Sequence, residues 1–128
     1  YTPLATNDAS LVSPERLKHM SMVTTATQRD FTLLVPSRFG PGFMKSVDNR
    51  HLLAKGSRQS AILGDQAFGH VGAGGSIGFA DPECGLAFSY TMTQMGNGIL
   101  LNERGQSLVD AAYLALGYKN NKAGVWVK

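Results

Sequence analysis

The stretch "AFGHVGAGGSIGFADPECGLAFSYTMTQM", residues Ala67–Met95, decides the fold and the interpretation of everything around it. Five glycines fall within the ten positions Gly69–Gly78, with a histidine among them. A glycine-rich run beside a strand can cradle a phosphate, hold a dinucleotide, line a hydrolase site, or form a turn without any ligand. The residues on either side of the run have to distinguish these four interpretations.

The residues after the glycines have the alternation of a β-strand. In "GLAFSYTMTQM", Leu86, Phe88 and Tyr90 share one face and small residues occupy the other. Small side chains on that second face suit close approach by a covering helix. Before them, "AFGHVGAG" and "SIGFADP" are short strand candidates that end at turn residues.

Upstream of this stretch the sequence predicts one helix and two strands. Ser13 as N-cap, followed by Pro14 at the first helical position, predicts a helix over about 13–25. The apolar run "DFTLLVP" predicts a strand over 30–36, and the turn residues "GPG" precede a shorter strand over 43–47.

Downstream, Asn102 is the predicted cap of a last helix that ends before Gly117. Its apolar stripe, at helical spacing, is Leu108, Ala111, Ala112, Ala115 and Leu116. The order is helix, strands, helix, with connections too short for parallel crossovers. The sequence therefore predicts an α+β fold in which helices flank an antiparallel β-sheet.

Composition excludes several classes of protein. The 128 residues are 43% hydrophobic and 16% charged, values typical of one globular domain or a piece of one. The densest basic group is interrupted by Asp48 and is predicted to be solvated surface rather than a nucleic-acid interface; it comprises Lys45, Arg50, Lys55 and Arg58. No apolar run is long enough to predict a membrane span.

The cysteine and the histidines predict neither a disulfide nor a metal site. Cys84 is the single cysteine, so no internal disulfide can form, and a passive thiol is expected. The three histidines lack the spacing of metal ligands. We therefore expect no metal and no cofactor.

The glycine run does not match the known phosphate-binding motifs. Its spacing fits a P-loop, but Gly75 stands where that motif needs lysine, and Ile77 stands where the dinucleotide motif needs glycine. The pentapeptide "GGSIG" matches a nucleophile elbow, but no histidine follows Ser76. A glycine turn that allows close backbone approach remains the alternative without function.

As an ordered series, the run resembles the serine β-lactamase-like family, which includes class C β-lactamases, penicillin-binding proteins and esterases. It is most similar to animal β-lactamase-related proteins, which carry His-x-Gly in place of Lys-Thr-Gly. The segments "SRFGPGF" and "LGYKNNKAGVWVK" extend the resemblance. It implies the C-terminal part of a β-lactamase/transpeptidase-like fold, with 1–27 as the end of the helical region, 28–101 as sheet strands, and 102–128 as the last helix and tail.

The resemblance also implies a site. His70, Val71 and Gly72 would form the third motif of the family on the strand beside the catalytic pocket, and Gly74 would also border the substrate. The backbone N–H of Ala73 would be an oxyanion donor, and His70 would polarise or position the substrate. Val71 replaces a threonine whose hydroxyl holds a substrate carboxylate, which favours ester, amide or peptide substrates over antibiotics.

The first two motifs of the family are missing. No lysine follows a serine at Ser-x-x-Lys spacing, and Tyr-x-Asn occurs only out of order, at Tyr118–Asn120. The resemblance implies that an N-terminal portion of the same protein carries both motifs, in a mitochondrial or extracellular location. This chain alone is then not expected to be active. A non-catalytic scaffold, an anion-binding loop and self-association stay open.

Overall fold

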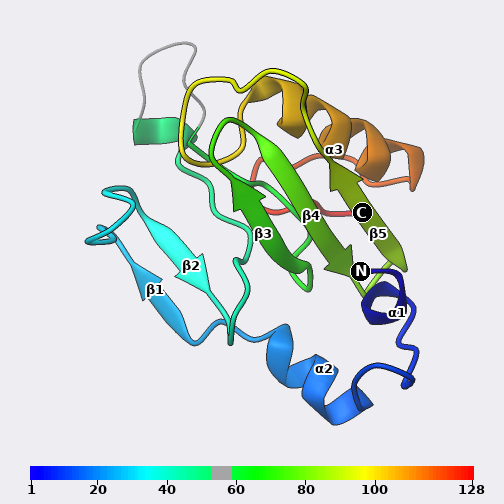
Figure 1. Ribbon diagram of the computed structural model, residues 1–128. Coiled ribbons are helices and arrows are strands. Elements are labelled where there is room, and N and C mark those ends of the chain that lie inside the picture. Colours follow the sequence, from blue (N-terminus) through cyan, green and yellow to red (C-terminus); the bar gives the residue numbers. More distant parts are fainter. Residues whose placement is uncertain (53–58) are drawn as a thin grey trace.

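A three-stranded antiparallel sheet forms the centre of the structure, a computed structural model that describes residues 1–52 and 59–128 (Figure 1). Its order is β3 (Phe68–Gly72), β4 (Ser76–Asp81) and β5 (Leu86–Tyr90). All three strands lie within residues 67–95, the segment in which the sequence predicted strands. Because β3 and β5 lie at the two ends of the order, each has one edge that is not paired within this sheet.

The turn between β3 and β4 explains two of the glycines. Gly74 and Gly75 have φ angles of 86° and 108°, a backbone region that residues with a Cβ rarely adopt. A Cβ on Gly75 would also overlap the side-chain amide of Asn102. The turn can therefore lie directly against the start of the last helix.

A second, two-stranded ribbon lies beside β3 (Figure 1). It pairs β1 (Thr25–Thr27) with β2 (Ser37–Phe39) in antiparallel register. Met44 connects the ribbon to the central sheet, because it forms isolated bridges with Phe39 and with Gly69. The predicted strand over 43–47 is thus present only as separate bridges.

The predicted strand over 30–36 is wrong. The Asp30 carboxylate accepts hydrogen bonds from the backbone N–H groups of Thr32 and Leu33, at 2.8 and 2.9 Å, which closes a turn. Leu34 then adopts a positive φ of 61°. These local side-chain to backbone bonds override the strand preference of the apolar run, as such bonds often do.

The helix predicted over 13–25 is shorter than expected. It is α2 (Pro14–Met20), and the Ser13 hydroxyl accepts a backbone N–H of its first turn, as an N-cap does. The chain beyond it becomes extended and enters β1. Two more short helical segments are present, α1 (Thr2–Ala5), which packs on β4 and β5, and the 3-10 helix η1 (Arg50–Leu52).

The last helix, α3 (Glu103–Ala115), begins where the sequence predicts but buries a different face. The Asn102 side chain accepts the Gly105 N–H at 3.2 Å. However, the predicted stripe is largely exposed, with Leu108 at 44% and Leu116 at 45%. The buried residues of α3 are Gly105, Gln106, Val109 and Tyr113.

Polar partners explain this choice of face. The Tyr113 hydroxyl donates to buried Asp81 at 2.7 Å and accepts the Gly64 N–H at 2.8 Å. Gln106 exchanges two hydrogen bonds with the backbone of Ile62. Burial of these polar groups without their partners would be costly, so their bonds determine which side of α3 faces the sheet.

Apolar side chains cover the two faces of the sheet in two separate clusters. Phe79, Val109 and Tyr113 belong to the cluster on the α3 side, where Tyr113 also stacks on Trp126 at 5.6 Å between ring centroids. The second cluster joins α1 and α2 to the opposite face and comprises Leu4, Ala5, Leu17, Phe68 and Ala80. No helix in the described part of the chain is long and apolar enough to span a membrane.

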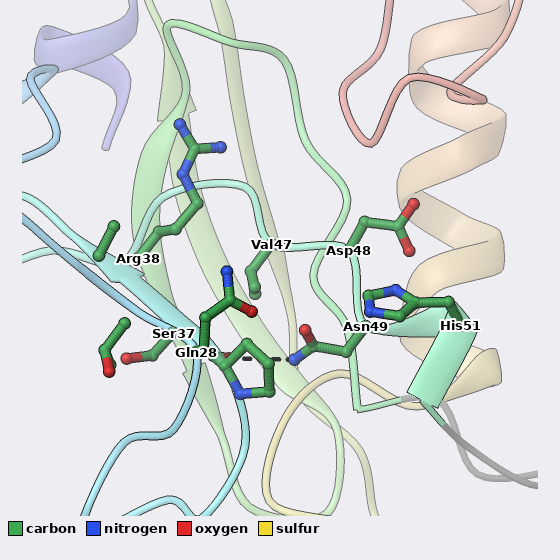
Figure 2. A pocket seen from close by; sticks show the side chains of 10 residues that line it. Gln28, Ser37, Arg38, Val47, Asp48, Asn49 and His51 are labelled. Atoms are coloured by element: carbon green, nitrogen blue, oxygen red, sulfur yellow. Dashed lines mark hydrogen bonds between the residues drawn. The ribbon is translucent and has the colours of Figure 1, made fainter.

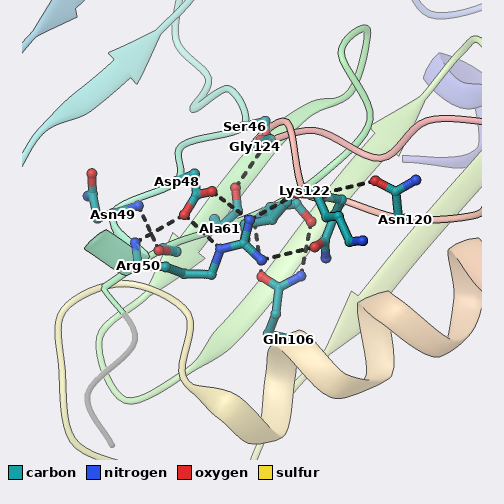
Figure 3. Close-up of polar contacts among 12 residues, drawn as sticks. Ser46, Asp48, Asn49, Arg50, Ala61, Gln106, Asn120, Lys122 and Gly124 are labelled. Carbon is teal, nitrogen blue, oxygen red and sulfur yellow. Dashed lines mark hydrogen bonds and ion pairs between the residues drawn. The ribbon is translucent and has the colours of Figure 1, made fainter. Parts of the chain in front are cut away.

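The structure describes two of the four basic residues that were predicted to be solvated surface, Lys45 and Arg50. Lys45 is only 2% exposed, which corrects the prediction, and burial lowers the pKa of its amine to about 8. Arg50 forms a 2.6 Å ion pair with Asp48 and donates to Asn121, which ties the C-terminal segment to this loop (Figure 3). The other two, Lys55 and Arg58, lie outside the described residues.

Candidate functional site

The edge of β3 is open where the sequence predicts the site. Met44 exchanges two backbone hydrogen bonds with Gly69, at 2.7 and 3.1 Å, and covers the edge at that point. From His70 to Ala73, no other described residue forms a β-bridge with this edge. An open strand edge of this kind can pair with an extended ligand.

A cavity of about 490 Å³ lies beside this edge and is bounded by His70, Val71 and Ala73. Three other parts of the chain complete its wall: the turn after β1, the Phe39–Met44 region, and the segment before α3. The volume is within the usual range for small-molecule sites. The fold thus brings together segments that are far apart in the sequence.

His70 and Val71 differ sharply in their surroundings, although they are neighbours. Val71 is 7% exposed and faces the core, whereas the His70 side chain is exposed. His70 Nδ1 lies 2.7 Å from the Val71 carbonyl oxygen. Because a carbonyl only accepts, Nδ1 carries the proton, and a neutral ring then has its lone pair on Nε2.

Ala73 is exposed at the end of β3 and follows its last residue. Its N–H takes part in none of the backbone hydrogen bonds outside the strands and helices of the described chain. The turn is closed one residue later, where Gly75 donates to the Gly72 carbonyl at 3.1 Å. A free donor therefore lies at the wall of the cavity.

Gly72 and Gly74 do not line this cavity in the structure. Gly74 is buried, and its carbonyl accepts the Gly96 N–H at 2.9 Å and the Asn102 side-chain amide at 2.7 Å. A Cβ on Gly74 would lie 3.0 Å from Met95. These contacts give Gly74 a packing role between the turn and the loop before α3.

Asp30 borders the same cavity, and the sequence did not indicate it. In addition to the two backbone donors of its turn, its other oxygen accepts the Ser37 hydroxyl at 2.8 Å. These hydrogen bonds lower the pKa of the carboxyl group. A turn signal at Asp30 was available, but its place beside His70 depends on how the β1–β2 ribbon packs.

A second cavity, of about 280 Å³, lies between the ribbon and the segment from Val47 to His51 (Figure 2). Two of its polar side chains, those of Asn49 and Arg38, donate hydrogen bonds to the backbone. The Asn49 amide donates to the carbonyls of Pro36 and Gln59, and Arg38 donates to that of Ser46. This cavity contains none of the predicted site residues between His70 and Gly74.

The described residues include no group of three or more His, Cys, Asp or Glu side chains arranged to hold a metal ion. Cys84 is half-buried, and burial is the main cause that raises the pKa of its thiol. The reactive thiolate is therefore scarce at neutral pH.

Comparison with solved structures identifies the fold. The chain is 30% identical to a penicillin-binding protein homolog from Caulobacter crescentus, with a TM-score of 0.70, over 89% of this chain and 29% of that one. A family VIII carboxylesterase is 29% identical, with a TM-score of 0.64 over the same shares. EstA from Arthrobacter nitroguajacolicus Rue61a is 29% identical, with a TM-score of 0.63, over 84% of this chain and 26% of that one.

The α+β fold is therefore that of the C-terminal part of a β-lactamase/penicillin-binding-protein-like structure. This chain spans less than a third of the length of each of these neighbours. No protein-family model matches the chain, and no curated protein sequence matches it.

Proposed function

We propose that this chain is the C-terminal portion of a serine hydrolase of the β-lactamase-like family. The whole protein would cleave an ester, amide or peptide bond through a serine acyl-enzyme. The main support is the open edge from His70 to Ala73 beside a cavity of about 490 Å³. The likeness to a carboxylesterase and a penicillin-binding protein homolog supports the same class of reaction.

In this proposal the Ala73 N–H is an oxyanion-hole donor. A backbone donor held in place by a sheet can stabilise the charge that develops on a carbonyl oxygen without reorganising during the reaction. Removal of one such donor typically costs about 3 kcal/mol of transition-state stabilisation. The free N–H of Ala73 at the cavity wall supports this role.

His70 would contact the substrate through Nε2. The Val71 carbonyl holds the proton on Nδ1, so a neutral His70 offers an acceptor to the cavity. Val71 faces the core and has no hydroxyl to offer a substrate carboxylate. Gly72 and Gly74 would keep the approach to the edge free of side chains, with Gly74 acting by its packing on Met95.

The nucleophile and its base would come from an N-terminal portion that carries Ser-x-x-Lys and Tyr-x-Asn. The His-x-Gly motif and the order of the residues around it favour the animal β-lactamase-related group within the family. A small neutral ester is the simplest substrate to test.

The test is hydrolysis of a chromogenic ester by this chain alone and by this chain combined with its upstream portion. We expect no turnover from the chain alone and turnover after combination. A fluorophosphonate probe on the natural protein should label a serine outside these 128 residues. Labelling of a serine within them would contradict the proposal.

The second candidate function is a non-catalytic scaffold. The exposed leucines of α3, Leu108 and Leu116, favour this alternative because they suit binding to another polypeptide. A combined protein that assembles stably, yet neither turns over esters nor reacts with the probe, would support the scaffold and contradict the hydrolase.

A further inference from the structure

We propose that the cavity beside His70 selects neutral acyl groups and rejects those that carry a carboxylate, and that Asp30 is the residue that enforces this selection. The inference rests on the proposed function, since it concerns which substrate the same cavity admits. It adds a specificity-determining residue that no motif in the sequence indicated.

Asp30 supplies a fixed negative charge at the cavity wall. Its carboxylate accepts three hydrogen bonds, from two backbone N–H groups and the Ser37 hydroxyl, at 2.8–2.9 Å. Donors to a carboxylate stabilise its charged form, and they lower the pKa of Asp30. The group is therefore ionised at neutral pH, and the same bonds hold it in place.

No lysine or arginine is among the described residues that border the cavity. Of the residues that border the cavity, only Asp30 and His70 are ionisable. Arg38, in β2, lines the other cavity and donates to the Ser46 carbonyl. The Val71 carbonyl already takes the Nδ1 proton of His70, so this nitrogen donates nothing to a carboxylate in the cavity.

The remaining wall suits an alkyl chain. Apolar side chains form most of it: Leu33, Phe39, Met44, Val71, Ile99 and Leu100. An acyl group with a terminal methyl can lie against these side chains, and a terminal carboxylate would lose its hydration and meet the charge of Asp30.

The inference can be tested on this chain by binding, without turnover. Two ligands of equal length, hexanamide and adipamate, differ in that adipamate ends in a carboxylate. Each is titrated into ¹⁵N-labelled protein at pH 7 and low salt, and the amide shifts of His70, Val71 and Ala73 are followed by NMR. We expect hexanamide to bind at least about threefold more tightly, the scale of a partly screened repulsion between like charges.

Salt and one substitution then assign the difference to Asp30. Addition of 0.5 M NaCl should reduce the preference for hexanamide, because salt screens the repulsion but leaves the cost of dehydrating the carboxylate. Asp30→Asn keeps an oxygen that can accept the backbone N–H groups of the turn but removes the charge, so the preference for hexanamide should fall to that of the unmodified protein in high salt. Asp8→Asn is the matched control, because Asp8 also accepts a backbone N–H in an exposed turn but does not border the cavity.

Three results would overturn the inference: equal affinity for the two ligands in the unmodified protein, a preference that salt and Asp30→Asn leave unchanged, or binding of neither ligand. If Asp30→Asn does not fold, the salt titration of the unmodified protein still decides. If this chain combined with its upstream portion turns over esters without distinguishing neutral acyl groups from those with a carboxylate, this inference is overturned and the proposed function is not. If the chain binds hexanamide in preference to adipamate but the combined protein turns over no ester, the proposed hydrolase function is overturned and this inference is not.

Discussion

At the residue scale, the direction in which a side chain points matters as much as the residue type. Side chains alternate along a strand, and in β3 His70 is exposed whereas its neighbour Val71 is buried. The same alternation shows why Val71 is not a simple substitute for threonine. A hydroxyl at that position would belong to a side chain of which only 7% is exposed, so little of it would be accessible to a substrate.

Replacement of Ala73 by proline tests the proposed oxyanion donor. Ala73→Pro removes the N–H, and we expect the kcat/KM of the complete protein for an ester to fall about 100-fold or more. Ala73→Ser keeps the N–H and is the matched control, with an expected loss of less than about threefold. Full activity in a folded Ala73→Pro variant would show that this N–H has no role in catalysis.

Replacement of Lys45 tests the cost of a buried amine. Its Nζ has no hydrogen-bond partner among the described residues, and its side chain is 2% exposed. Lys45→Met removes the charge and keeps the length, so we expect the free energy of unfolding at pH 7 to rise by about 1–2 kcal/mol. Lys18→Met, on an exposed position of α2, should change it by less than about 0.5 kcal/mol.

The pH dependence gives a second readout for Lys45. Its pKa is lowered in the folded chain, from 10.5 to about 8, so the unfolded chain binds more protons between these values. The free energy of unfolding of the unmodified protein should therefore rise relative to that of Lys45→Met as the pH rises from 8 toward 9.5. Parallel urea unfolding curves at pH 7 and pH 9.5 would measure this, and a constant difference would contradict it.

At the element scale, the sequence predicts where α3 begins but not which side it buries. Asn102 is a local signal, and the helix follows it directly. The buried side depends on Ile62 and Asp81, which lie far away along the chain and bond to Gln106 and Tyr113. The spacing of apolar residues along the helix carries no information about such distant partners. It therefore predicted burial of the flank of α3 that is exposed in the structure.

The same reasoning applies to residues 30–36. Apolar character alone predicted a strand, but the carboxylate of Asp30 takes the N–H groups that a strand would need. This failure also concealed the candidate site, since the resulting turn is what brings Asp30 into the cavity wall with His70. The strand that carries His70 and Val71, in contrast, could be located from the sequence because the signals for it are local.

The exposed flank of α3 is the expected contact for the upstream portion. Gln106 and Asp110 face Ile62 and Asn121 on one side of the helix. At 3.6 residues per turn, Leu108 lies on the opposite flank. Leu108→Glu should therefore leave the stability of this chain within about 0.5 kcal/mol but weaken its association with the upstream portion at least tenfold.

The control for this prediction is Leu114→Glu. Leu114 is also exposed, at 54%, but lies about 240° around the helix from Leu108. Association is measured by sedimentation and by the ester turnover of the mixture. Equal association of the two variants would mean that the leucine flank is not the contact.

At the scale of the whole molecule, the fold resembles part of a larger structure. The chain covers 29% of the penicillin-binding protein homolog, and its sheet ends at β5 without a further strand among the described residues. Side chains of β5 are mostly half-buried rather than buried. An open edge and an incompletely covered face are what an additional strand and helix would complete.

Hydrogen exchange can test whether the upstream portion adds a strand to β5. In an antiparallel pair, alternate amides of an edge strand point away from the partner, so about half of the β5 amides should exchange rapidly in this chain alone. The amides of β4 are the internal control, because β4 is paired with β3 and β5 on its two sides and should be protected throughout. Addition of the upstream portion should slow the rapid β5 amides at least tenfold and leave those of β4 nearly unchanged, whereas unaltered β5 exchange in a mixture that turns over esters would show that the two portions join elsewhere.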